Sequence, residues 1–263
     1  MTAGLQATDR AVLEVSGEDA GHFLQNLVTN NVEGLAEGAC VYAALLSPQG
    51  KYLFDFFVIR HGAGFLIDVK ADRAQPLLQR LTLYKLRARV TVAPSDLAVV
   101  LGQGEPPSGA VIDPRSAALG WRAWVADPQA YLADLAPLDP GALLAARIAA
   151  CVPETGIELV PDESYILEMG FARLNGVDFR KGCYVGQEVT ARMKHKTELR
   201  KGLVRVEIEG EAPAPGTEIL AGERVAGRLY SSTGGAGLAY LRFDRAEGAA
   251  LAAGSARLRA ELA

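Results

Sequence analysis

The sequence predicts an α+β protein built on mainly antiparallel sheets, followed by a small antiparallel β-barrel at the C-terminal end. Between Ala11 and Val92 the apolar patterns follow the order strand, helix, three strands, helix, strand. From Leu203 onward, short apolar runs alternate with Gly or Pro, which is typical of a small barrel or sandwich. The chain has 263 residues, 49% of them hydrophobic, enough to bury one large core or two smaller ones.

The first elements have recognisable boundaries. Ala11–Val15 is predicted to be a short strand, and Ser16 with Asp19 resembles a capping box at the start of a helix. That helix carries apolar residues at helical spacing from Phe23 to Val28, and two asparagines end it.

Three further strands are expected next, separated by turns rich in glycine. They are followed by a helix over Asp72–Leu83 and by a returning strand over Leu86–Val92. The three strands are Cys40–Leu46, Tyr52–Arg60 and Phe65–Val69.

The rest of the chain divides into a less regular middle and the barrel. In the middle we expect a strand over Leu119–Val125 and a helix over Ala142–Ala150. The Ala-rich stretch Gly248–Ala253 is interpreted as a loop. The expected barrel strands are Leu203–Ile208, Thr217–Leu220, Arg224–Tyr230, Gly237–Arg242 and Ala256–Leu258.

Composition excludes several classes of protein. A net charge of −4 argues against nucleic-acid binding by bulk charge, and no apolar run is long enough to span a bilayer. The N-terminus lacks the pattern of a signal peptide. Cys40, Cys151 and Cys183 are widely spaced, so we expect no disulfide framework, no permanent metal site and a cytoplasmic location. A cluster ligated within one chain is disfavoured because such clusters usually need four cysteines.

The segment Lys181–Glu188, with the sequence KGCYVGQE, is the most unusual part of the chain. It combines a thiol, a cation, an amide, a carboxylate and two glycines in eight residues. The glycines break any regular element, and Lys181 beside Cys183 is expected to favour the thiolate. The segment therefore predicts a reactive thiol presented on a rigid loop; the alternative is an inert cysteine in a structural loop.

This motif resembles the K-G-C-Y-x-G-Q-E signature of the YgfZ-type folate-binding proteins, relatives of the glycine-cleavage T-protein aminomethyltransferase whose eukaryotic counterparts act in iron–sulfur protein maturation. The similarity extends along the chain. It includes the segments Gly17–Val32, Pro48–Lys51 with Asp55, Asp113–Arg115 with Leu119–Arg122, Leu167–Gly170 and Gly237–Arg242.

The resemblance implies a three-part ring around a central channel in which tetrahydrofolate sits. It divides the chain into a folate-binding α+β region over residues 1–196, made of two interleaved subdomains, and a barrel over residues 197–263. It also implies a role in iron–sulfur cluster assembly or repair in client enzymes, including tRNA-modifying ones.

Asp55 interrupts an apolar strand, so its carboxylate needs a partner or a cavity. By resemblance to the T-proteins it lies beside the reactive nitrogen of the folate, and it is a candidate catalytic residue together with Cys183. The alternative is a salt bridge with a nearby arginine or an edge-strand position.

Glu168 is a second charge in an apolar context and, by resemblance, the anchor of the pterin. A carboxylate can accept two parallel N–H donors, as the amino-pyrimidine edge of a pterin presents them. Tyr184 could stack on the same ligand and Gln187 could contact it through its amide. Lys181 and Arg192 complete the expected cofactor-binding set, and Arg192 is also placed to pair with Glu188.

A basic cluster surrounds the motif in an otherwise acidic protein. It can attract the glutamate tail of folate, tRNA or an acidic protein partner, or it can be an ordinary solvated surface. Its members are Arg173, Arg180, Lys181, Arg192, Lys194, His195, Lys196, Arg200 and Lys201.

Two other functions stay open at this point. A folate-dependent aminomethyl or one-carbon transferase would depend on Asp55 and not on Cys183. An adaptor without thiol or folate chemistry would depend on the surface between Arg173 and Lys201.

Overall fold

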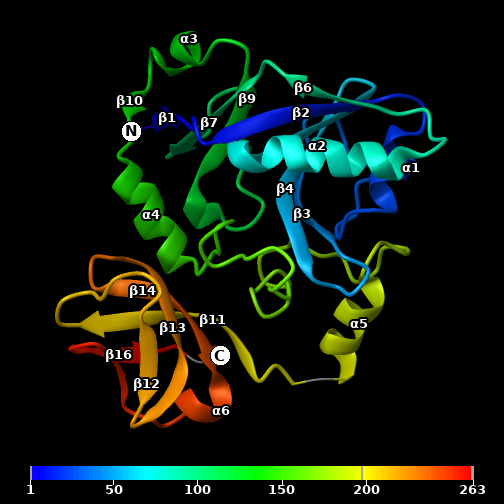
Figure 1. The fold of residues 1–263 in the computed structure, drawn as a ribbon. Coiled ribbons are helices and arrows are strands. Elements are labelled where there is room, and N and C mark those ends of the chain that lie inside the picture. Colours follow the sequence, from blue (N-terminus) through cyan, green and yellow to red (C-terminus); the bar gives the residue numbers. More distant parts are fainter. Residues whose placement is uncertain (1, 197, 262–263) are drawn as a thin grey trace.

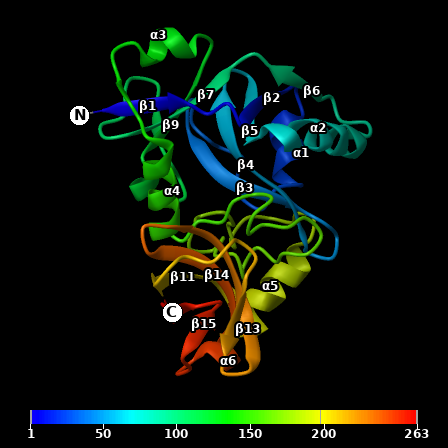
Figure 2. The same cartoon turned by 60° about the vertical axis from the view of Figure 1, so that its left-hand side comes forward.

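The computed structural model describes residues 2–196 and 198–261. Two antiparallel sheets lie side by side, and a closed barrel lies against them on the other side of a long irregular segment (Figures 1 and 2). The α+β class, the antiparallel pairing and the C-terminal barrel agree with the prediction from sequence. Within the described residues, no helix combines the length and the apolar character needed to cross a bilayer.

The first sheet has the order β3-β4-β5-β2-β6, so β5 is its central strand and the long strand β4 lies between β3 and β5. Helix α2 covers one face of this sheet, and the short helix α1 lies at the end of the same layer (Figure 1). The elements are β2 (Arg10–Ser16), α1 (Ala20–Gln25), β3 (Cys40–Leu46), β4 (Tyr52–His61), β5 (Gly64–Lys70), α2 (Ala71–Lys85) and β6 (Thr91–Ser95).

The second sheet has the order β10-β1-β7-β9-β8, and all its pairs are antiparallel except β1 with β10. Its first strand comes from the N-terminus, so the chain crosses between the two sheets immediately before β2. The elements of this part are β1 (Ala3–Gln6), β7 (Ala98–Gln103), β8 (Val111–Ile112), the 3-10 helix η1 (Ala117–Leu119), β9 (Trp121–Val125), α3 (Pro128–Leu132), β10 (Ala136–Pro137) and α4 (Pro140–Ala149).

The barrel closes in the order β11-β14-β13-β12-β15-β16. Its interior is filled by aliphatic side chains such as Val206, Leu229 and Leu241, and closure leaves no unpaired sheet edge. The elements are β11 (Lys201–Glu209), β12 (Glu218–Ala221), β13 (Arg224–Thr233), β14 (Ala236–Arg242), α6 (Phe243–Ala246), β15 (Leu251–Ala253) and β16 (Ala256–Ala260).

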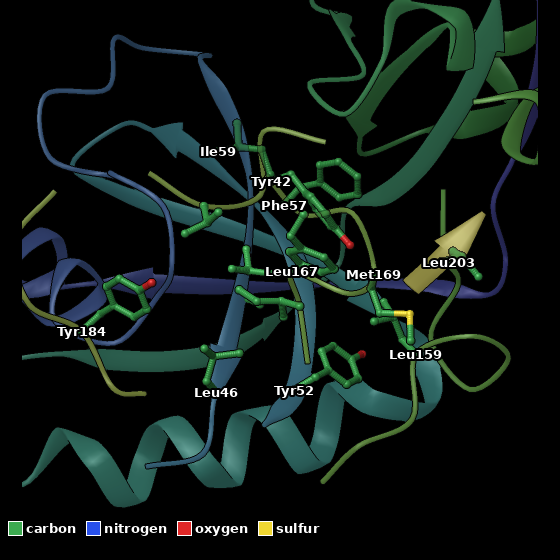
Figure 3. Close-up of a cluster of buried hydrophobic side chains, with 14 of the residues drawn as sticks. Tyr42, Leu46, Tyr52, Phe57, Ile59, Leu159, Leu167, Met169, Tyr184 and Leu203 are labelled. Carbon is green, nitrogen blue, oxygen red and sulfur yellow. The ribbon is translucent and has the colours of Figure 1, made fainter. Parts of the chain in front are cut away.

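Residues 151–186 form turns and irregular backbone between α4 and helix α5 (Gln187–Lys196) and fill the centre of the molecule. A single hydrophobic cluster joins this segment to the first sheet and to the barrel (Figure 3). Tyr42 lies between Phe57 and Phe171, with ring centroids 5.3 and 5.0 Å away. The three parts therefore share one core, and the central segment is held by packing.

Several predicted elements need correction. Leu86 takes a left-handed φ of 43°, so helix α2 ends there and the following strand begins only at Thr91. Helix α1 starts after Asp19 without a side-chain cap, because the Asp19 carboxylate accepts the backbone N–H of Arg89. The Ala-rich stretch predicted to be a loop contains strand β15, whose partners come from the barrel.

Candidate functional site

The loop that carries Cys183 is anchored on both sides of an exposed thiol. Lys181 and Tyr184 are each only 8% exposed, whereas Gly182 and Cys183 face solvent. The loop therefore alternates between buried anchors and an exposed tip. This placement agrees with a presented thiol and not with a packed one.

Lys181 is anchored through its ammonium group, which reaches the end of helix α1 and the turn behind it. Nζ donates to three backbone carbonyls, those of Gln25 at 2.7 Å, Val28 at 2.5 Å and Asn30 at 2.9 Å. Burial lowers the pKa of Lys181 to about 8, so the ammonium is mostly protonated at neutral pH. Its three protons are engaged by the protein, so Lys181 has no donor left for a cofactor, contrary to our expectation.

The other anchors are Tyr184 and Gly186. The Tyr184 ring is part of the central hydrophobic cluster, and Lys181 Nζ lies 5.2 Å from its centroid. A Cβ on Gly186, which has φ of +81°, would lie 2.6 Å from the carbonyl oxygen of Ser47. The KGCYVGQE loop therefore packs directly on the turn between β3 and β4, the second segment that the sequence singled out.

Gln187 begins helix α5 and is half-buried, and Arg192 lies exposed on that helix. The expected pair between Glu188 and Arg192 is not among the ion pairs of the described residues. Arg173 is also used locally, because its guanidinium donates to the carbonyls of Ala150 and Cys151.

The remaining basic cluster is smaller than the sequence suggested, because Lys181 is buried and Arg173 is engaged. Lys194 lies over the exposed ring of Phe179, with Nζ 5.3 Å from its centroid. The side chain of Lys196 lies outside the described part of the structure. The exposed cations that accompany the Cys183 loop are Arg180, Arg192 and Lys194.

Asp55 is buried on β4, inside a cage of hydroxyl groups instead of in a salt bridge. Tyr42 Oη donates to Oδ2 at 2.8 Å and Tyr52 Oη donates to Oδ1 at 2.7 Å. Thr155 from the central segment also hydrogen-bonds Oδ1 and contacts Tyr52. Burial, and then the Asp55 charge, raises the pKa of Tyr42 and Tyr52, which keeps both phenols protonated as donors.

Glu168 lies apart from this cage, where the central segment meets the barrel. Tyr240 on β14 donates to Oε2 at 2.5 Å, and Lys201 Nζ lies 3.9 Å from the same oxygen. Burial, followed by the bond to Glu168, raises the pKa of Tyr240. Oε1 has no hydrogen-bond partner within the described residues, so one carboxylate oxygen is left for a ligand.

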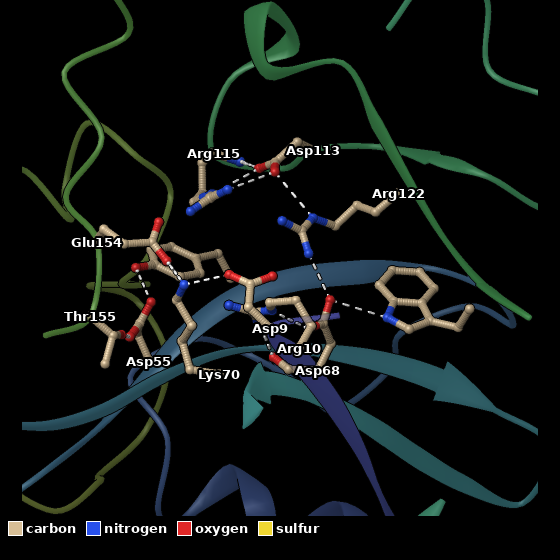
Figure 4. Close-up of polar contacts among 12 residues, drawn as sticks. Asp9, Arg10, Asp55, Asp68, Lys70, Asp113, Arg115, Arg122, Glu154 and Thr155 are labelled. Atoms are coloured by element: carbon tan, nitrogen blue, oxygen red, sulfur yellow. Dashed lines mark hydrogen bonds and ion pairs between the residues drawn. The ribbon is translucent and has the colours of Figure 1, made fainter. Parts of the chain in front are cut away.

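The structure contains a buried ionic network that the sequence analysis missed (Figure 4). Asp68, fully buried on β5, accepts from Arg10 Nε at 2.7 Å, Arg122 Nη1 at 2.6 Å and Trp124 Nε1 at 3.2 Å. Asp113 joins the network through Arg122 at 3.1 Å. The sequence did contain a signal for this network, because Asp68 interrupts an apolar strand in the same way as Asp55.

Two further contacts extend the network. Arg115 makes a two-pronged ion pair with Asp113, which the DPR motif places two residues away. Lys70 bridges Asp9 at 2.6 Å and Glu154 at 2.7 Å, and Glu154 precedes Thr155 of the Asp55 cage (Figure 4). The network thus runs from the second sheet to the neighbourhood of Asp55.

A cavity of about 470 Å³ lies against this network. Its lining combines charged side chains of both signs with apolar ones. The cations include Arg10, Lys70 and Arg115, the carboxylates are those of Asp9, Asp113 and Glu154, and the apolar residues include Leu143 and Leu144 of helix α4. The volume lies within the range of small-molecule sites. None of the predicted residues Asp55, Glu168, Tyr184, Gln187 and Arg192 lines it.

Cys40 and Cys151 are half-buried, and both pack against the central hydrophobic cluster. Burial raises the pKa of both thiols, which keeps them protonated and unreactive. Cys183 is the exposed cysteine of the described chain. Both partly buried cysteines thus behave as the small hydrophobic residues that we expected.

Two family models match separate parts of the chain. The family model of the GCVT N-terminal domain matches residues 6–117, and that of the CAF17 C-terminal beta-barrel domain matches residues 200–263. The crystal structure of glycine cleavage system aminomethyltransferase T from Bartonella henselae superimposes with a TM-score of 0.80. It covers 98% of this chain and 84% of that one at 16% identity, which establishes the fold alone.

Sequence relatives are more specific. The mitochondrial iron–sulfur cluster assembly factor IBA57 of Mus musculus is 32% identical over 91% of this chain and 77% of its own length. IBA57 of Homo sapiens is 33% identical with the same coverage. These relatives correct the expected YgfZ-type assignment to a more specific one. They are IBA57 proteins, which are relatives of the YgfZ and CAF17 proteins, and not YgfZ itself.

The expected cytoplasmic location is corrected by the same comparison, because these relatives are named as mitochondrial proteins. Unpaired cysteines are compatible with any reducing compartment, so the cysteine pattern could not distinguish one such compartment from another. From the identity and the coverage, the chain belongs to the family of the iron–sulfur cluster assembly factors IBA57.

Proposed function

We propose that this protein supports the assembly or repair of iron–sulfur clusters in client enzymes, with Cys183 as the residue that contacts the cluster. The observation that carries the proposal is the exposed Cys183 thiol on a loop whose two neighbours, Lys181 and Tyr184, are buried. A thiolate is the usual protein ligand of such clusters. After the thiol loses its proton, its sulfur can replace a ligand on one iron of a cluster that a partner carries.

One cysteine is too few to hold a cluster alone, since these clusters take four ligands from protein. Within the described residues no group of three or more potential metal ligands is found. The cluster is therefore cargo shared with a partner. A groove of about 430 Å³ lined by Phe179 and Arg180 lies next to the loop in sequence and offers that partner a contact surface.

The test is reactivation of a cluster-dependent client, with tRNA-modifying enzymes among the first to examine. Cys183→Ser is expected to abolish support of the client without changing the thermal stability, because the residue is exposed. Cys151→Ser is the matched control. Because Cys151 is half-buried, its substitution is expected to leave support of the client unchanged. Full activity of Cys183→Ser would refute the proposal.

We also propose that the protein binds tetrahydrofolate, and the cavity beside the ionic network supports this second candidate. Arg10 and Arg115 would hold the carboxylates of the ligand, while Leu143 and Leu144 would contact its aromatic body. The donors fit, because Arg10 Nη1 and Arg115 Nη1 have no hydrogen-bond acceptor within the described residues. When bound, the folate would supply a one-carbon carrier or act as a regulator.

Calorimetric titration with tetrahydrofolate and a polyglutamylated form separates the possible sites. Weaker binding by Arg115→Gln alone would support the cavity, whereas weaker binding by Glu168→Ala alone would support the pterin anchor expected from the resemblance. No binding to the wild type would remove folate from the function. If Cys183→Ser kept client activity while Asp55→Ala lost it, a transferase of the T-protein type would be favoured.

A further inference from the structure

We propose that Lys181 is a positioning residue for Cys183, whose ammonium acts as a built-in cation in a cage of three backbone carbonyls. The inference rests on the proposed role of Cys183 and adds how the loop that carries the thiol is held in place. The acceptors belong to Gln25, Val28 and Asn30, more than 150 positions earlier in the chain. The contact thus ties the Cys183 loop to the end of helix α1.

The cage exists because the chain turns sharply after helix α1. The last carbonyls of a helix have no partner within the helix, and those of the turn behind it are equally open. Here the acceptors at 2.7, 2.5 and 2.9 Å converge on one point, which a tetrahedral ammonium with three N–H groups satisfies. A guanidinium is planar and larger, so arginine does not reproduce this contact.

Lys181 lies two residues before Cys183, so anchoring its ammonium also restricts where the thiol can move. The Tyr184 ring is buried on the other side of the thiol, and the Lys181 ammonium lies 5.2 Å from its centroid. Gly182 and Cys183 are therefore a short exposed span between two fixed points. Without the ammonium, one end of the span is released, and one buried and two partly buried carbonyls lose their donor.

Native-state hydrogen exchange measures this constraint directly. In Lys181→Ala, the hydrogen-bonded amides of Leu27, Val28 and Thr29 in the turn after α1 are expected to exchange about tenfold faster or more, the factor that loss of a charge-assisted hydrogen bond gives. Amides of β3 and β4 should be unchanged, which shows that the fold is intact. Lys85→Met, in the last turn of α2, is the control for removal of a lysine charge.

Chemical rescue distinguishes positioning from a general effect on folding. Propylammonium replaces the atoms missing in Lys181→Ala, so it is expected to restore slow exchange in the turn after α1. Tetramethylammonium has the same charge but no N–H donor, and it should not. Equal rescue by both cations, or unchanged exchange in this turn of Lys181→Ala, would overturn the proposal. If Lys181→Ala does not fold alone, folding that depends on propylammonium and not on tetramethylammonium supports it.

Client activity provides a separate readout. Lys181→Ala is expected to lose support of the client and to regain it with propylammonium, while Cys183→Ser should not respond to the amine. If Cys183→Ser is fully active, the proposed function fails, whereas the exchange experiment still decides whether Lys181 holds the turn after α1. If exchange and rescue behave as expected but client activity is normal in Lys181→Ala, positioning of the thiol for function is refuted.

Discussion

Gly50 and Gly186 lie against each other, so that a Cβ on Gly186 would come within 3.1 Å of the Gly50 Cα atom. Both take a left-handed φ, +73° and +81°, where glycine is favoured. Gly50 belongs to the turn between β3 and β4, and Gly186 closes the Cys183 loop. This contact joins the two glycine motifs of the chain, so the loop rests on the same hairpin that carries Asp55.

Gly186→Ala is expected to destabilise the protein by about 1–3 kcal/mol, because the new methyl group meets the Ser47 carbonyl in a backbone conformation that alanine disfavours. Urea denaturation measures the change. Gly182→Ala is the control in the same loop, since a Cβ there would meet no heavy atom within 4 Å. Equal stabilities of the two variants would show that the loop does not depend on this packing.

Glu158 joins the barrel to the central segment from a fully buried position. Its carboxylate accepts from Arg147 Nη1 at 3.0 Å and from Ser231 Oγ on β13 at 2.7 Å. Glu158→Ala leaves a buried guanidinium unpaired and is expected to reduce stability by about 3–5 kcal/mol. Loss of the exposed pair between Glu218 and Arg228 should change stability by less than about 1 kcal/mol, which calorimetry of both variants can check.

Asp113 is expected to make stability depend on pH in the acid range. Burial alone would raise its pKa, but Arg115 and Arg122 overcome this effect and hold the pKa well below its ordinary value of 3.8. The unfolded state therefore binds the proton more readily, and the stabilisation present above about pH 4 is lost as the pH falls toward the lower folded pKa. Asp113→Asn should be less stable at pH 7 and should show a flatter decline between pH 5 and pH 2, both assessed from urea midpoints.

Asp55→Ala is expected to destabilise the fold by about 1–3 kcal/mol, because the hydroxyls of Tyr42, Tyr52 and Thr155 lose a buried acceptor. Tyr42→Phe removes one of these bonds and should have a smaller effect, about 1 kcal/mol. Thermal unfolding of both variants provides the comparison. An Asp55→Ala protein as stable as the wild type would mean that the cage contributes little to folding.

The sequence predicted best the strands that are long enough to show an apolar pattern within their own residues. Tyr52–Arg60 is an apolar run that Asp55 interrupts once before Arg60, and the structure buries both faces of it between the central cluster and the core under α2. Strand β1 and strand β15 were not predicted, because four and three residues carry no period of their own. Their conformation follows from distant partners in β7 and in β12 with β16.

The sequence determined the class of fold and the unusual chemistry of the KGCYVGQE loop, because apolar periodicity, turn glycines and residue type are local properties. The tertiary structure alone decided what Lys181 and Asp55 contact. Lys181 was expected to face a ligand but binds carbonyls far away in the chain. For Asp55 the sequence left a folate contact, a salt bridge or an edge-strand position open, and its protein partners are three hydroxyls. A buried polar group must find partners, and which partners it finds depends on the packing of segments distant in sequence.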